Sequence, residues 1–202
     1  MPLKKLKKKY RKWEPHLLIA DELLSVIIIL AITLLRPDYL FIGVYVLIIP
    51  YLILSRRTRL LPNLVISSII AIIWTYLASS MYDYNHVYIT ILGMNAYPLF
   101  GWAIGLFGVY MIFSHYGYRF KKCRFTKKLL LFCLMYWILL IIAETVAYHI
   151  FNIHDLATAA YSGLPLCNCM HAPHWMQAAY FAMGPIYFLI IELKSRYDSS
   201  RI

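Results

Sequence analysis

One short stretch of the chain, LCNCMHAPHW at residues 166–175, combines several side chains that bind metals or exchange electrons. Thiolates and imidazoles suit zinc and copper, and Met170 would add a soft ligand for Cu(I). Structural zinc sites usually draw ligand pairs from two separated segments, whereas here four ligands crowd into one loop. If the stretch binds copper or zinc, a partial site completed by His154 or Asp155 is therefore more plausible than four ligands from this stretch alone. The candidate ligands within the stretch are Cys167, Cys169, His171 and His174.

The same two cysteines have two further interpretations. A disulfide between Cys167 and Cys169 would enclose a single residue, so it would be strained and readily reduced. It would suit redox exchange better than crosslinking, although its C-x-C spacing differs from the C-x-x-C of thioredoxin-like proteins. In the third interpretation the stretch is a structural loop packed against Trp175 and nearby tyrosines. The residue types leave all three interpretations open.

A single carboxyl, Glu144, lies inside the apolar stretch LLIIAETVAYHIF. An ionisable side chain at membrane depth costs a few kcal/mol to insert and usually faces the protein interior with a partner. Helical spacing puts Tyr148 one turn above Glu144, and puts His149 on a different face beside Thr145. The functional interpretation of Glu144 is a general acid or base. The alternative is a structural hydrogen bond to a polar stripe at Ser68, Thr75 and Ser79.

The elements that position these residues are apolar segments. Hydrophobic residues make up 62% of the 202-residue chain and charged residues only 14%, which is the composition of a membrane protein. A helix that crosses the hydrocarbon core needs about 20 mostly apolar residues. The first segment is not a cleaved signal peptide, because it is too long and contains Asp21 and Glu22. Six spans are expected, at about 17–35, 39–55, 60–81, 97–114, 129–150 and 175–193.

The basic residues orient these spans. If the N-terminus is cytoplasmic, 19 of the 20 Lys and Arg lie inside and only Arg36 lies outside. A net charge of +11 would suggest nucleic acid for a soluble protein. Here the positive charge occurs in short runs between spans, which indicates topology and contact with anionic lipid, and we expect no nucleic-acid partner.

We therefore expect an all-α integral membrane protein of six transmembrane helices arranged as three hairpins. Both termini would be cytoplasmic, in a plasma membrane or an endomembrane. A basic segment at 1–16 precedes the transmembrane domain at 17–193, and a short tail follows at 194–202. Two long extracytoplasmic loops, at 82–98 and 151–174, are expected to be ordered. Each would hold a short interfacial helix, at about 86–92 and 153–160.

Most histidines fall on the predicted outer side, where groups for acid–base or ligand chemistry gather. The first hypothesis for function is a membrane-embedded enzyme that acts on a lipid or isoprenoid-like substrate in the outer half of the bilayer. The alternatives are a non-catalytic subunit of a membrane complex or homo-oligomer, and a copper or zinc handling or transport protein that uses the loop at Cys167–His174. No other cofactor is indicated. The candidate catalytic residues are Glu144, His149, His154, Tyr148 and His86.

Overall fold

The computed structural model describes residues 20–24, 26–27, 36–85, 87–116, 120 and 123–199. The chain divides into two compact units, Met1–Leu35 and Arg36–Ile202. In the first unit, residues 20–24 and 26–27 are helical. Most of the predicted span at 17–35 lies outside the described residues, as does His86.

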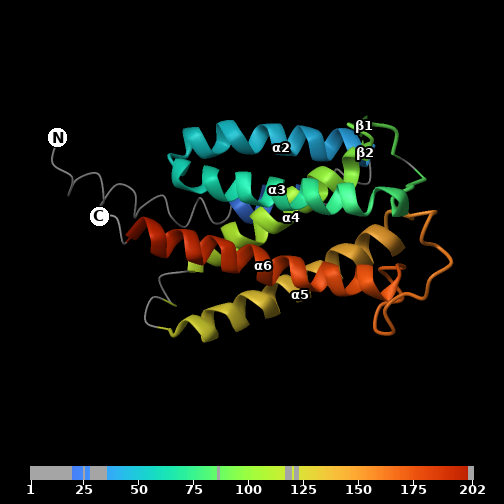
Figure 1. The fold of residues 1–202 in the computed structure, drawn as a ribbon. Coiled ribbons are helices and arrows are strands. Elements are labelled where there is room, and N and C mark those ends of the chain that lie inside the picture. The colour runs from blue at the N-terminus through green and yellow to red at the C-terminus, as the bar shows by residue number, and fades with distance from the viewer. Residues whose placement is uncertain are drawn as a thin grey trace. The chain divides into compact units, whose positions relative to one another are not determined.

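Five long helices form the described part of the second unit (Figure 1). Each is long and apolar enough to cross a membrane, and together they coincide with the second to sixth predicted spans. The prediction of a mostly helical chain with apolar helices long enough to span a membrane is therefore confirmed, while the number of six spans and the location of the termini stay predictions. The helices are α2 (Pro37–Leu54), α3 (Leu61–Leu77), α4 (Ala96–His115), α5 (Phe125–His149) and α6 (His174–Ser199).

The connections gather at two ends of this bundle (Figure 1). The loop end carries residues 78–85, 87–95 and 150–173, and the basic end carries residues 55–60, 116, 120, 123 and 124. Among the described residues, every Lys and Arg except Arg36 belongs to the basic end or to the helix turns beside it. Short 3₁₀ turns continue the chain at both ends, η1 (Thr58–Leu60) and η2 (Ser79–Met81).

The two predicted loop helices are wrong for the residues that the structure describes. In the first loop, β1 (Thr90–Ile91) and β2 (Met94–Asn95) form an antiparallel hairpin. Its two-residue turn has positive φ at Leu92 (51°) and Gly93 (78°), as a tight hairpin turn requires. In the second segment, 153–160, Asp155 forms a β-bridge and residues 156–160 are turns, so the segment is not a helix. A short amphipathic pattern is weak support for a helix, and local turn geometry decides both segments.

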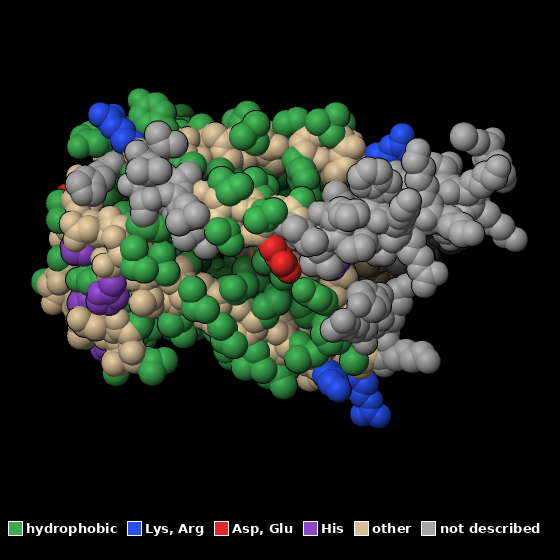
Figure 2. All heavy atoms as spheres, turned by 180° about the vertical axis from the view of Figure 1, so that it is seen from behind, with side chains coloured by type: hydrophobic (Ala, Val, Ile, Leu, Met, Phe, Trp, Pro, Cys, Tyr) green, Lys and Arg blue, Asp and Glu red, His purple; other side chains and the backbone are tan. Residues whose placement is uncertain are grey.

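Aromatic side chains fill the interior, where α3 and α4 pack together and both contact α6. Phe107, Phe132, Tyr187 and Phe188 are fully buried. The outer surface of the helices is also apolar, and on α5 it forms a stripe at four-residue spacing. On the face seen in Figure 2, hydrophobic side chains cover the bundle between its ends, as a lipid-facing surface requires. The exposed stripe on α5 consists of Leu130, Leu134, Ile138 and Ile142.

A proline in α6 leaves a backbone carbonyl oxygen free to accept a hydrogen bond from α5. Pro185 has no N–H, so the carbonyl oxygen of Phe181, four residues earlier, loses its helical donor. The indole Nε1 of Trp137 on α5 donates to this oxygen at 2.9 Å. The neighbouring Tyr136 hydroxyl donates to the carbonyl oxygen of Tyr180 at 2.6 Å. Side chains of a neighbouring helix thus satisfy the backbone that the proline exposes, as the membrane interior demands.

Candidate functional site

The two long loops are hydrogen-bonded to each other at the loop end. The Asp83 amide donates to the Asp155 carboxylate at 3.0 Å, and Tyr84 pairs with Asp155 in an antiparallel bridge. The Asn85 backbone amide donates to the carbonyl oxygen of His154 at 3.3 Å, and the His154 backbone amide donates to the side-chain oxygen of Asn85 at 3.2 Å. The side-chain amide of Asn85 also donates to the carbonyl oxygen of Asn152. Residues 83–85 and 152–155, which belong to the similar sequences MYDYNH and IFNIHD after α3 and α5, therefore pair with each other at this end.

Beneath the joined loops, a buried hydroxyl connects three helices. The Tyr82 hydroxyl oxygen accepts hydrogen bonds from the indole Nε1 of Trp74 (2.6 Å) and of Trp102 (3.1 Å). These two bonds use both lone pairs of the Tyr82 oxygen. Its own proton therefore points to the Tyr180 hydroxyl oxygen, which lies 3.2 Å away. Burial raises the pKa of Tyr82 well above its usual value, and the charge of Glu144 acts in the same direction.

Glu144 belongs to α5, and its charge contributes to the raised pKa of Tyr82 in the aromatic cluster that Trp74, Tyr82, Trp102 and Tyr180 form. Burial raises the pKa of Tyr84, and coupling to the neighbouring tyrosines and to the Asp155 and Glu144 carboxyls raises it further. Among the described residues, no hydrogen-bond donor contacts the partly buried Glu144 carboxylate. Within the polar stripe predicted to serve as its partner, the Ser68 hydroxyl lies 2.7 Å from the Tyr45 hydroxyl of α2, and the buried Thr75 hydroxyl has no hydrogen-bond partner among the described residues. The predicted hydrogen bond between α3 and Glu144 is therefore absent among the described residues.

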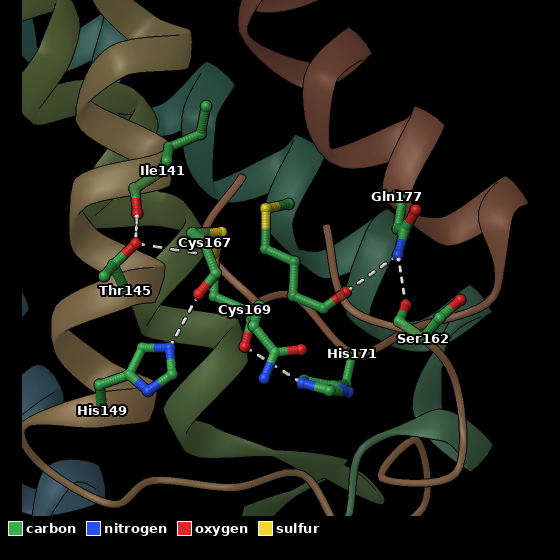
Figure 3. The surroundings of a disulfide bond; sticks show 10 residues. Ile141, Thr145, His149, Ser162, Cys167, Cys169, His171 and Gln177 are labelled. Atoms are coloured by element: carbon green, nitrogen blue, oxygen red, sulfur yellow. Dashed lines mark hydrogen bonds between the residues drawn. A yellow bond between two sulfur atoms is a disulfide. The ribbon is translucent and has the colours of Figure 1, made fainter. Parts of the chain in front are cut away.

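The opposite side of the same helix turn faces the cysteine loop (Figure 3). Cys167 and Cys169 form a disulfide. The Nε2 of His149 donates to the carbonyl oxygen of Cys167 at 2.8 Å. The Thr145 hydroxyl lies 2.6 Å from the carbonyl oxygen of Ile141 and 3.7 Å from the Cys169 sulfur. His149 thus lies beside Thr145 and away from Glu144, as the helical spacing predicts.

Backbone and amide hydrogen bonds hold this loop in place from the side of α6. The buried Gln177 amide donates to the carbonyl oxygens of Ser162 and Met170, both at 3.1 Å. Figure 3 shows Gln177 reaching from its helix to the loop. The Leu164 amide donates to the Cys169 carbonyl oxygen at 2.8 Å. The loop is therefore fixed by contacts that do not involve sulfur.

Three of the candidate residues form one stack of rings above α5. The Tyr148 ring lies between the imidazoles of His154 and His171, with centroid distances of 4.2 and 4.8 Å. The Nε2 of His154 also donates to the Tyr148 carbonyl oxygen at 3.2 Å. The stack connects the third loop to the last turn of α5, so Tyr148 and His154 are placed to hold the loops rather than to face Glu144.

The predicted metal ligands do not converge on a common point in this arrangement. The sulfurs of Cys167 and Cys169 are bonded to each other, so neither is a thiolate ligand. Both ring nitrogens of His171 lie at backbone carbonyl oxygens, at 2.7 and 3.2 Å, and Nδ1 of His174 lies 3.5 Å from the Gln177 side-chain oxygen. Within the part of the chain that the structure describes, no three His, Cys, Asp or Glu side chains are placed to hold a metal ion. The residues present do not fit copper or zinc while the disulfide is formed.

The residues of the aromatic cluster were not among the predicted site residues. The available signal was the number of tyrosines and tryptophans, because a buried phenol or indole needs a polar partner. The partners are far apart in the chain, however: Tyr82 and Tyr180 are separated by 98 positions. No local spacing rule relates such residues.

The sequence matches no protein-family model, and no curated protein or solved structure is significantly similar to it. The geometry of the loop end is therefore the basis on which a function can be assigned.

Proposed function

We propose that this protein is a membrane-embedded enzyme that acts on a lipid or isoprenoid-like substrate, with Glu144 as its proton-transferring group. One observation carries the proposal: a carboxyl in an apolar helix has no hydrogen-bond donor among the described residues. A structural carboxyl at this depth would be expected to have such a partner. The nearby polar groups are engaged elsewhere, since Thr145 and His149 bond to backbone oxygens.

The surroundings of Glu144 suit acid–base chemistry on an apolar molecule. In this proposal the rings of Tyr82 and Tyr84, whose pKa the charge of Glu144 raises, stabilise a cation that forms on a hydrocarbon chain. In its acid form Glu144 would protonate a double bond or a leaving oxygen of the substrate. The resulting carboxylate would then remove a proton from a neighbouring carbon, which completes an isomerisation or elimination. His149, His154 and Tyr148 act as positioning residues that hold the loops over the site.

We propose further that the loop end faces the outside or the lumen and that both termini are cytoplasmic. Two features support this orientation. The described Lys and Arg side chains lie near the basic end, apart from Arg36. The Cys167–Cys169 disulfide lies at the loop end, and disulfides persist on the oxidising side of a membrane.

The test of catalysis compares two carboxyl-to-amide variants in the same bundle. Glu144→Gln removes the proposed proton-transferring group, whereas Glu192→Gln makes the same change toward the basic end of α6. Each protein is reconstituted into nanodiscs with lipid extract from its native membrane, and lipid products are followed by mass spectrometry. We expect Glu144→Gln to lower product formation at least about 100-fold with an unchanged midpoint of thermal unfolding, and Glu192→Gln to retain it.

A non-catalytic role in a membrane complex is the second candidate. It is favoured by apolar residues at the tips of both loops: Leu92 is 90% exposed and Leu166 is 85% exposed. In this case wild-type nanodiscs would form no product, and Glu144→Gln would lower thermal stability or release a partner in native mass spectrometry. Either result would overturn the enzymatic proposal.

A further inference from the structure

We infer that Cys167–Cys169 is a redox-active disulfide that exchanges with a dithiol, with Cys167 as the attacked residue and Cys169 as the leaving sulfur. The inference goes beyond the proposed acid–base function and does not depend on it. Three features of the loop carry it: unequal access to the two cysteines, a hydroxyl beside one sulfur, and a loop held in place by other bonds.

Access to the two cysteines is unequal. Cys169 is fully buried, whereas Cys167 is partly exposed and lies between the exposed residues Leu166 and Asn168. A thiolate attacks a disulfide sulfur directly, so the rate of exchange depends on access to that sulfur. An incoming thiol therefore reaches Cys167 first.

The buried sulfur has a hydrogen-bond donor beside it. The Thr145 hydroxyl lies 3.7 Å from the Cys169 sulfur and 2.6 Å from the Ile141 carbonyl oxygen (Figure 3). Its single proton turns from the carbonyl oxygen to the sulfur when Cys169 becomes a thiolate. A stabilised thiolate leaves faster, so Thr145 positions and assists the leaving group.

The disulfide contributes little to holding the loop. It links residues only two positions apart, so it closes a very small loop and removes little entropy from the unfolded chain. The loop is fixed instead by hydrogen bonds from Gln177, His149 and the Leu164 amide. The bond can therefore open and close while the fold is kept.

The exchange has two steps. One thiolate of the dithiol attacks the Cys167 sulfur, the bond to Cys169 breaks, and its electron pair leaves on the Cys169 sulfur. The second thiolate of the dithiol then attacks the dithiol sulfur that is bonded to Cys167, and the Cys167 sulfur leaves with the electron pair of that bond. The dithiol is oxidised to a disulfide by two electrons, both cysteines are reduced, and the two protons of the dithiol end on them.

The first experiment maps the attacked cysteine in the full-length wild-type protein in nanodiscs. Reduced glutathione is added, the reaction is quenched with acid, and the first mixed disulfide is located by peptide mass spectrometry. We expect the adduct on Cys167 at least about tenfold more often than on Cys169. Equal labelling, labelling mainly at Cys169, or a disulfide that resists reduction in the folded protein would overturn the inference.

The second experiment tests the leaving group through the rate of reduction by dithiothreitol. Thr145→Val keeps the size of the side chain but removes the hydroxyl, and we expect reduction to slow several-fold. Thr145→Ser keeps the hydroxyl and should restore the wild-type rate. Alkylation of the free Cys123 at the basic end serves as an internal reference. A Thr145→Val protein that is reduced as fast as wild type would contradict the assignment of Cys169 as the leaving sulfur.

Discussion

The ring of Tyr136 packs directly on the backbone of Gly184, where the Cβ of any other residue would overlap it. This contact brings the Tyr136 hydroxyl to the Tyr180 carbonyl oxygen and Trp137 to the oxygen that Pro185 leaves without its helical donor. Close approach at a glycine thus permits the repair of a proline-interrupted helix by its neighbour. Tyr136, Trp137 and Glu144 all belong to α5, so the contact of α5 with α6 also fixes the position of Glu144 along the bundle.

Gly184→Ala is expected to destabilise this joint. The added methyl group must displace a ring that is held by its own hydrogen bond, which costs about 1–3 kcal/mol. The matched control is Gly105→Ala on α4, where an added Cβ meets no atom within 4 Å. Thermal unfolding in nanodiscs should show a lower midpoint for Gly184→Ala only. Equal midpoints for the two variants would mean that the ring moves without cost.

Asp38→Ala is expected to release the first loop from α2. Asp38 is fully buried, and its carboxylate accepts hydrogen bonds from the amides of Tyr88 and Ile89 at 3.0 and 3.2 Å. Without this acceptor the two amides have no partner there, and their hydrogen–deuterium exchange should accelerate at least about tenfold. Asp83→Ala removes an exposed carboxyl from the same loop end and is the control. Unchanged exchange at Tyr88 and Ile89 in Asp38→Ala would contradict the role of this carboxylate.

The stability of the joined loops should depend on pH through Asp155. Burial raises the pKa of Asp155 to about 6, against the hydrogen bonds from the amides of Asp83 and Ala157. Because an unfolded aspartate titrates near pH 4, the folded protein binds the proton more tightly between about pH 4 and pH 6. This contribution to stability is full below about pH 4 and is lost as pH rises through about 6.

Asp155→Asn, which cannot titrate, isolates the effect. The difference between the unfolding midpoints of the wild type and this variant should fall steadily from pH 4 to pH 7. A difference that stays constant over this range would show that Asp155 has the same pKa in the folded and unfolded states. Subtracting the variant removes the contribution of the other titrating groups.

The course of the helices could be predicted because hydropathy is local information. The predicted spans at 97–114 and 129–150 differ from α4 and α5 by a few residues, since the length of an apolar run sets the length of a spanning helix. The predicted loop helices were wrong because local turn geometry decides these segments, as the positive φ angles of Leu92 and Gly93 show in the first loop. The placement of His149 beside Thr145 followed from helical spacing alone.

By itself, then, the sequence determined the apolar helices, the grouping of most histidines near one end, and the faces of α5. Only the tertiary structure decided the partners of those faces: Tyr82 with Tyr180, Asn85 with His154, and Ser68 with Tyr45 instead of Glu144. The physical reason is that burial depends on the composition of a short segment. A hydrogen bond in an apolar interior depends instead on which distant residue packing brings within about 3 Å.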